Sequence, residues 1–306
     1  MMKIGLIDCD NTKWPNLALM KVSTFHKSIG DIVEWYDPMF GGRYDIVYVS
    51  KVFSWSADYP HEINADLILT GGCGFGEAKD LGIDDFMPDY SLYGIEDTAY
   101  GFLTRGCYNH CPYCDVPKLD GNAVRPVASL GDFWNGQKYI KIMDSNLLGL
   151  NDRKMLKHFL FSLEWSGAYV DFTQGLDIRL MDVEIAEYIR KTKIKTVHFA
   201  WDDPRDKIVP EKLEWFRDYT RWGRDKVAVY VLVDYWSTLE EDLERIYKIR
   251  EIGFRPYVMV YDKHLLPKGH VLLKLQRWCN SPMIFNTTER FEDYGKILKS
   301  GEGELL

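Results

Sequence analysis

Residues 101–114 read GFLTRGCYNHCPYC and contain three cysteines, Cys107, Cys111 and Cys114, in the spacing C-x3-C-x2-C. The segment continues an apolar run over residues 99–104 that predicts a β-strand. Three thiolates without a fourth partner nearby can ligate three irons of a four-iron cluster, which leaves one iron open to a substrate or cofactor. The same spacing also allows a zinc site in which His110 completes a Cys3His tetrahedron.

Strands and helices alternate from this segment toward the C-terminus. The predicted strands are residues 99–104, 139–143, 169–172, 196–200, 227–233 and 256–260. The predicted helices are residues 152–165, 182–191, 211–222, 239–251 and 271–278. This alternation predicts a partial (β/α)6 TIM barrel, or an open doubly wound sheet, over residues 98–306 with a C-terminal extension.

A second α/β domain with its linker is predicted over residues 1–97. Apolar runs at 3–8, 32–36, 46–50 and 67–70 predict strands, and residues 15–29 predict a helix with Asn11 or Thr12 as its cap. Such continuous apolar runs are typical of a parallel sheet that is buried on both faces. We therefore expect a Rossmann-like, flavodoxin-like sheet here, with the acidic, turn-rich segment 77–97 as the connector.

Composition narrows the function classes. Apolar residues make up 46% and charged residues 27% of the chain, which is typical of a folded globular protein. The net charge of −8, from 46 acidic and 38 basic residues, gives no indication of a nucleic-acid partner. The sequence has no apolar run of membrane-spanning length and no signal peptide, so we expect a cytoplasmic protein with no membrane partner.

The cysteine region resembles the radical S-adenosylmethionine (radical SAM) superfamily. The resemblance rests on the cysteine spacing, on the aromatic Tyr113 before the third cysteine, and on the position after the first barrel strand, and it extends over roughly residues 98–265. It implies that Cys107, Cys111 and Cys114 ligate a [4Fe–4S] cluster whose open iron binds SAM. It further implies reductive cleavage of SAM to a 5′-deoxyadenosyl radical for C–H activation, and an electron donor such as flavodoxin or ferredoxin. Tyr113 is expected to present its backbone to the adenine of SAM.

The resemblance also assigns residues at the carboxyl ends of two later strands, where parallel barrels place their chemistry. Asp144, Ser145 and Asn146 replace the family's Gly-Gly-Glu, which contacts the amino group of SAM. Gln174, Asp177 and Arg179 are expected to hold its ribose and carboxylate, and Arg179 could bind the carboxylate bidentately. The alternative for Asp177 and Arg179 is a salt bridge within the loop.

Polar residues also follow the last three predicted strands. Asp202, Asp234 and His264 either face the substrate or cap the next element. Cys279 is either a packed thiol on an amphipathic helix or, functionally, a hydrogen-atom donor or a methyl carrier. The sequence does not identify the substrate.

The N-terminal domain resembles the cobalamin-binding domains that precede some radical SAM barrels. Of the fingerprint Asp-x-His-x-x-Gly, Asp8 matches, Asp10 replaces the cobalt-ligating histidine and Lys13 replaces the glycine. The resemblance therefore predicts the fold, favours methyl transfer, and leaves the binding of cobalamin open.

Two other functions are alternatives. Methylthiotransferases also begin with an α/β domain, which holds a second cluster through three cysteines. Cys9 and Cys73 resemble two of these cysteines, while Ser50 lies near the third place. The remaining alternative is a non-catalytic protein stabilised by zinc.

Overall fold

The computed structural model describes residues 1–76 and 81–295, which form two compact units. The first unit comprises Met1–Gln174 and Lys191–Lys193, apart from the undescribed gap. The second comprises Gly175–Arg190 and the described residues from Ile194 onward. The predicted domain boundary after residue 97 lies inside the first unit and stays a prediction.

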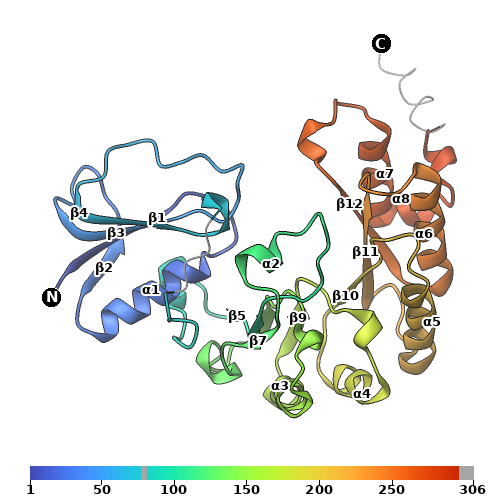
Figure 1. The fold of residues 1–306 in the computed structure, drawn as a ribbon, viewed down its shortest axis with the longest axis horizontal. Coiled ribbons are helices and arrows are strands. Elements are labelled where there is room, and N and C mark those ends of the chain that lie inside the picture. The colour runs from blue at the N-terminus through green and yellow to red at the C-terminus, as the bar shows by residue number, and fades with distance from the viewer. Residues whose placement is uncertain (77–80, 296–306) are drawn as a thin grey trace. The chain divides into compact units, whose positions relative to one another are not determined.

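The N-terminal sheet has four parallel strands in the order β2-β1-β3-β4, which is the beginning of the flavodoxin-like order. The strands are β1 (Lys3–Asp8), β2 (Ile32–Trp35), β3 (Tyr44–Ser50) and β4 (Ala65–Gly71). Helix α1 (Leu17–Ser28) packs on one face of this sheet (Figure 1). The predicted parallel α/β architecture of this region is confirmed.

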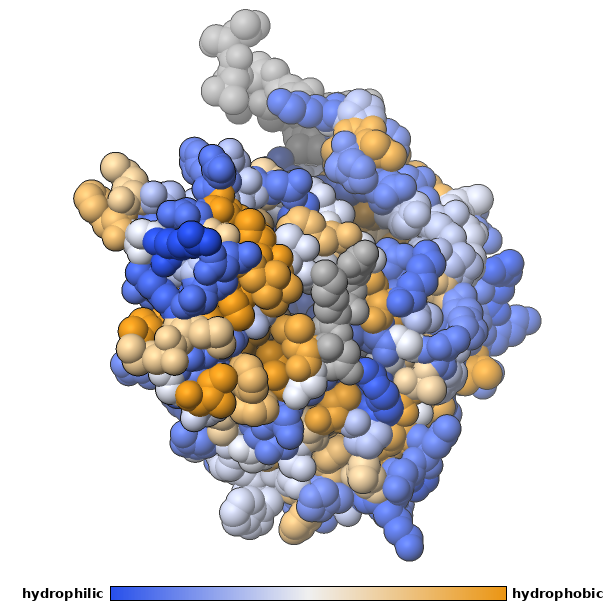
Figure 2. All heavy atoms as spheres, turned by 60° about the vertical axis from the view of Figure 1, so that its left-hand side comes forward, coloured by the Kyte–Doolittle hydropathy of each residue, from blue (hydrophilic) through white to orange (hydrophobic). Residues whose placement is uncertain are grey.

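The prediction that the N-terminal sheet is buried on both faces is wrong for its two outer strands, β2 and β4. Leu67 and Ile68 of β4 are 47% and 45% exposed, and β2 has no fully buried residue. The connections β2–β3 and β3–β4 contain no α-helix, so among the described residues of this region α1 is the one α-helix that covers the sheet. Apolar side chains of the N-terminal sheet are therefore exposed at the surface. Figure 2 shows this side of the N-terminal region facing the viewer, with apolar residues in orange.

The cap of α1 is Asn16, so the predicted caps Asn11 and Thr12 were wrong. The Asn16 side chain accepts a hydrogen bond from the Leu19 N–H (3.2 Å) and donates one to the Ser50 hydroxyl on β3 (2.8 Å). One side chain thus satisfies a free helix N–H and joins the helix to the sheet. The sequence alone does not show the second bond, which fixes the start of the helix.

The first unit also contains a three-stranded parallel sheet of β5 (Thr98–Gly101), β8 (Tyr139–Ile142) and β9 (Tyr169–Phe172). Asp152 caps helix α3 (Arg153–Ser166), which leads to β9. The predicted strand 99–104 was too long, because β5 ends at Gly101. Residues Thr104–Arg105 instead form β6, which pairs antiparallel with β7 (Arg125–Pro126).

The second unit contains a parallel sheet of β10 (Val197–Ala200), β11 (Val227–Val233) and β12 (Arg255–Val260). Both three-stranded sheets follow the chain order, as a (β/α) barrel requires, and the six-stranded partial barrel itself stays a prediction. The accompanying helices are α4 (Val183–Lys191), α5 (Ile208–Thr220), α6 (Leu239–Ile252) and α7 (Val271–Asn280). Two short helices, α2 (Val116–Leu119) and α8 (Pro282–Thr287), were not predicted. In the described part of the chain, no helix combines the length and apolar character needed to cross a membrane.

A buried ion pair holds the carboxyl ends of β10 and β11 together. Arg245 and Asp242, one turn apart on α6, have side chains that are only 2% and 1% exposed. The Arg245 guanidinium also donates to the backbone carbonyls of Trp201, Asp202 and Leu232 at 2.7–3.0 Å. This one side chain therefore supplies hydrogen-bond donors to carbonyls at the ends of two strands.

We predict that Arg245→Met lowers the free energy of unfolding by about 3–5 kcal/mol, because it leaves Asp242 buried without its counter-ion. Urea unfolding followed by tryptophan fluorescence measures the change. Arg190→Met is the matched control, since Arg190 forms the same i,i+3 pair with Glu187 on the surface. We expect the control to cost less than about 1 kcal/mol. Equal losses for the two variants would refute the structural role of Arg245.

Candidate functional site

The three clustered cysteines lie on a loop that is closed at its base. Strands β6 and β7 pair on either side of residues 106–124, and the Val127 N–H donates to the Leu103 carbonyl at 2.9 Å. Gly106 has φ +89°, and a side chain there would collide with the Ala123 carbonyl. The Cys107 N–H then donates to the Gly121 carbonyl at 3.1 Å. The two ends of the cysteine loop are therefore held next to each other by backbone hydrogen bonds.

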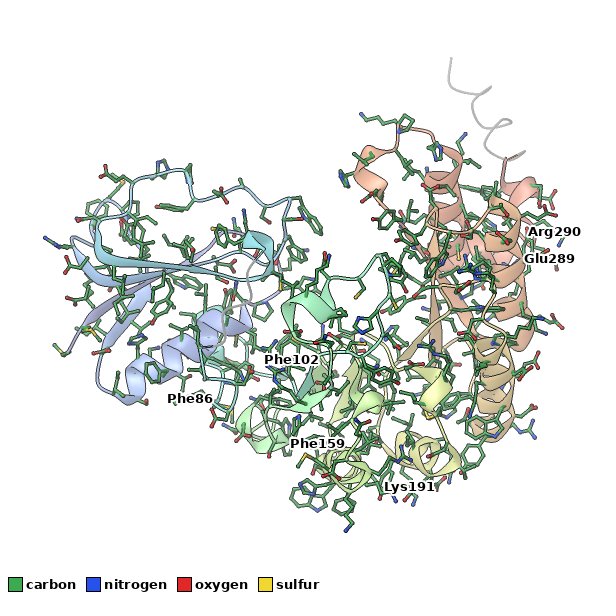
Figure 3. All side chains as sticks on the ribbon, in the orientation of Figure 1. Phe86, Phe102, Phe159, Lys191, Glu289 and Arg290 are labelled. Carbon is green, nitrogen blue, oxygen red and sulfur yellow. The ribbon has the colours of Figure 1, made fainter. Side chains whose placement is uncertain are left out.

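An ionic contact fixes the same base from outside. Arg105 on β6 binds Asp84 through two hydrogen bonds of 3.0 Å and contacts Asp120 at 3.3 Å. Its guanidinium also lies 4.0 Å from the ring centre of Phe102, which Figure 3 labels in the segment that follows β5. Arg105 thereby joins the predicted connector segment, through Asp84, to both ends of the cysteine loop.

Asp144, two residues after the end of β8, is the buried residue that holds the segment leading into the loop. It is 3% exposed, and its carboxylate accepts hydrogen bonds from the Leu103 N–H (2.9 Å), the Thr104 N–H (2.6 Å) and the Thr104 hydroxyl (2.5 Å). Burial raises the pKa of Asp144 to about 7. The three hydrogen bonds lower this pKa, but their effect is smaller than that of burial. Asp144 lies at the carboxyl end of a strand, as predicted. Its hydrogen bonds, however, hold the backbone of residues 103–104, and its predicted contact with SAM stays a prediction.

Cys107 and Cys111 lie close enough to Cys114 to affect its thiol. Burial raises the pKa of Cys114, and the negative charges of Cys111 and Cys107 raise this pKa further. The Cys114 N–H donates to the Cys111 carbonyl at 2.9 Å, which forms a turn. The x2 spacing thus brings the second and third cysteines together, while Cys107 is the buried member of the set.

Asn146, at the start of the short 3-10 helix that follows β8, contacts the first cysteine. Its side-chain amide nitrogen lies 3.5 Å from the Cys107 sulfur, and Asn146 is 3% exposed. Its amide oxygen is buried and accepts no hydrogen bond from any described residue. A donor to sulfur and a buried acceptor with no protein partner are thus adjacent at this strand end.

These residues fit a four-iron cluster by their chemistry. Three thiols on one loop, with a neutral amide donor beside one of them, form a suitable donor set. Within residues 1–76 and 81–295, no three Cys, His, Asp or Glu side chains are arranged to hold a single metal ion. A cluster is bound differently, because each thiolate ligates a different iron. His110, the fourth ligand of the zinc alternative, is exposed.

The other residues assigned to SAM fall in two places. Ser145 is half-buried beside Asp144, and Gln174 is exposed at the end of the first unit. Asp177 and Arg179 belong to the second unit, where Arg179 binds Asp177 through two hydrogen bonds of 2.8 and 2.7 Å. The loop salt bridge considered as the alternative is therefore present. That Arg179 binds the carboxylate of SAM stays a prediction. It requires that the ligand carboxylate replace Asp177 as the partner of the guanidinium. Tyr113 is half-buried on the cysteine loop.

Each three-stranded sheet has one apolar buried face and one polar, aromatic face. In the first, Ile140, Ile142, Val170 and Phe172 are buried, whereas Tyr100, Lys141 and Asp171 share the other face in register. Trp14 covers part of this second face, since the Lys141 ammonium lies 4.0 Å from its ring centre.

The second unit repeats the arrangement. His198 stacks on Tyr230 with ring centres 5.2 Å apart, and Tyr230 contacts Tyr257 edge-on at 5.7 Å. Tyr257 remains exposed, whereas Val197, Phe199 and Val258 on the opposite face are fully buried. Both sheets therefore present a face suited to contact with a ligand rather than to a filled apolar core.

The edge of the N-terminal sheet does not fit cobalamin ligation. The Asp10 carboxylate, in the place of the missing histidine, accepts hydrogen bonds from the backbone N–H groups of Val52 (2.6 Å) and Phe53 (3.1 Å). Asp8 accepts a hydrogen bond from the Tyr93 hydroxyl at 2.7 Å. The fingerprint positions thus organise the loops at this edge, and no cobalt ligand is found among them.

Cys9 and Cys73 follow β1 and β4 but have different surroundings. Cys9 is half-buried and packs against the cluster of Ile7, Tyr44, Val47 and Val49. Cys73 is exposed, and Asp120 and Arg105 of the cysteine-loop base are the charged groups that act on it. A shared metal site of Cys9 and Cys73 stays a prediction.

Several other candidate residues have structural partners. The Asp202 carboxylate accepts a hydrogen bond from the Leu232 N–H at 3.0 Å. Asp234 is exposed, with φ +69°, and His264 is exposed on a short 3-10 helix. Cys279 is buried on α7, where its thiol donates to the Pro256 carbonyl at 3.5 Å, and burial raises its pKa to about 12, which favours the unreactive thiol form.

Sequence reasoning missed Thr104, Tyr108 and Gly149 as parts of the site. Thr104 supplies two of the three donors to Asp144, while Gly149 packs against both Asn146 and Tyr108. For Thr104, the sequence signal was its position two residues before the pair Gly106-Cys107. Gly149 gave none, because Tyr108 and Val124, which it also lies against, belong to the cysteine loop far earlier in the chain.

We predict that ionisation of Asp144 destabilises the fold as the pH rises. Its pKa in the folded state, about 7, lies above the ordinary value of 3.8, so the folded state retains the proton longer. This group therefore lowers the free energy of unfolding by about 1.4 kcal/mol per pH unit between about pH 4 and pH 7. Asp144→Asn should flatten this slope in urea unfolding, whereas the exposed Asp115→Asn should not. A wild-type slope in Asp144→Asn would contradict the prediction.

One known protein shows a partial similarity to this chain. No protein-family model matches the chain. A CDK5RAP1-like protein of Oryza sativa subsp. japonica is 24% identical over 144 residues, which is 44% of this chain and 24% of the relative. The matched region thus spans about a quarter of the relative's length.

Proposed function

We propose that this protein is a radical SAM enzyme that activates a C–H bond of its substrate. The observation that carries the proposal is the closed loop that holds Cys107, Cys111 and Cys114, on which the first two thiols lie close enough to act on the third electrostatically. The partial similarity to the CDK5RAP1-like protein, a member of the radical SAM methylthiotransferase family, supports it. The proposal covers SAM as co-substrate and a small electron-transfer protein, such as flavodoxin or ferredoxin, as partner.

Cys107, Cys111 and Cys114 would hold the [4Fe–4S] cluster. When bound, this group supplies the electron that cleaves SAM to methionine and a 5′-deoxyadenosyl radical. The task of the chain is then to hold the loop, orient SAM and exclude water. Asp144 holds the loop entry through Leu103 and Thr104, and Arg105 holds its base through Asp84 and Asp120. These buried contacts fix the loop before any ligand arrives, which lowers the entropic cost of binding.

Each three-stranded sheet, taken by itself, has a polar face to which a substrate can bind. Tyr100 and Lys141 in the first unit, and Tyr230 and Tyr257 in the second, offer aromatic faces and one cation. Such groups bind planar or polar molecules through stacking and hydrogen bonds. Methyl transfer through cobalamin receives no support from the residues at the N-terminal sheet edge.

We predict that the anaerobically reconstituted protein with SAM and dithionite forms 5′-deoxyadenosine, measured by mass spectrometry. Cys111→Ala should reduce the product at least about 100-fold, because the cluster loses one of its three ligands. Cys279→Ala is the matched control, since this buried cysteine lies outside the loop, and it should retain product formation. A wild-type protein that binds zinc instead of iron and sulfide would overturn the proposal.

Methylthiotransfer is a second candidate, favoured by the family of the partial relative. It requires a second cluster near Cys9 and Cys73, whereas our first candidate requires about four irons per chain. We expect the Cys9→Ala/Cys73→Ala double variant to keep the wild-type iron content, measured by inductively coupled plasma mass spectrometry. A loss of about half the iron would instead establish the second cluster and favour methylthiotransfer.

A further inference from the structure

We propose that Asn146 is a positioning residue for Cys107 and that its amide sets the reduction potential of the cluster bound there. The inference rests on the proposed function and adds a role for a residue that the sequence assigned to SAM. In this role Asn146 acts through a cysteine ligand and does not touch the reacting atoms.

The contact is between two buried groups that lie far apart in the sequence. The Asn146 amide nitrogen is 3.5 Å from the Cys107 sulfur, across 39 residues of chain. A thiolate ligand accepts hydrogen bonds and cannot donate them, so only the amide nitrogen can make a favourable contact with it. The opposite amide orientation would place the oxygen against a negatively charged sulfur.

The surroundings of Asn146 hold the amide in this place. Gly149 lies directly against it: a β-carbon at position 149 would be 2.9 Å from the Asn146 amide nitrogen and 2.8 Å from a ring carbon of Tyr108. The Gly149 N–H also donates to the Asn146 carbonyl at 3.0 Å, which closes the turn between them. The absence of a side chain at Gly149 is therefore what leaves space for the amide between Tyr108 and the sulfur.

The effect of this bond on a cluster follows from its charge. Reduction adds one negative charge, part of which is carried by the ligating sulfurs, so an N–H donor stabilises the reduced form more than the oxidised form. Burial strengthens the effect, because water does not compete for the sulfur. Loss of the amide donor should therefore make the cluster harder to reduce.

The test uses the full chain, reconstituted anaerobically without SAM, in a redox titration followed by electron paramagnetic resonance. Asn146→Leu keeps the side-chain volume and removes the donor. Gly149→Ala keeps Asn146 and displaces its amide. We expect both variants to change the ratio of reduced to oxidised cluster at a fixed solution potential about tenfold toward the oxidised form, which corresponds to about 59 mV for one electron. The exposed Asn151→Ala is the control and should keep the wild-type potential.

Two further outcomes separate this inference from the proposed function. A wild-type potential in Asn146→Leu, together with a raised KM for SAM, would overturn the inference and return Asn146 to SAM binding. In that case the wild-type protein still forms 5′-deoxyadenosine, and the proposed function stands. A wild-type protein that assembles no iron–sulfur cluster would instead overturn the proposed function and, with it, the inference.

Discussion

The buried carboxylate of Asp144 is the constraint on which the candidate site depends. It accepts three hydrogen bonds from Leu103 and Thr104, at the point where the chain leaves β5. Unpaired backbone N–H groups in this buried place would be costly, so the carboxylate determines where the strand stops and where the cysteine loop begins. The pairing of β6 with β7 and the salt bridges of Arg105 then hold the loop that follows.

Strand ends elsewhere in the molecule are stabilised in the same manner. At β10 and β11 the buried Arg245 supplies donors to three carbonyls, and at β1 and β3 the side chains of Asp10 and Asn16 bind neighbouring groups. Parallel strands end with free carbonyls and N–H groups at one edge, and polar side chains satisfy them there. Many of the polar residues at strand ends thus have structural partners, and Asp144 and Asn146 differ in lying next to the cysteine loop.

The sequence predicted most of the fold and the chemistry-bearing segment. The strand and helix positions agree closely because apolar periodicity reports burial directly, and the start predicted for the helix over residues 239–251 coincides with the Thr238–Glu241 capping box of α6. The predictions that failed concern single side chains whose partners are distant in the chain. Asn16 replaced Asn11 and Thr12 as a cap through its bond to Ser50, and β5 ended early through Asp144.

The sequence by itself determined the three clustered cysteines, the alternation of strands and helices, and the polar residues at the strand ends, because these depend only on local spacing. Only the tertiary structure decided what those residues contact. It placed the Asn146 amide on the Cys107 sulfur, paired Arg179 with Asp177, and used Asp10 to bind backbone N–H groups. Such contacts depend on which distant segments meet in the folded chain, and a hydrogen-bonding side chain takes the partner that the packing brings within about 3 Å.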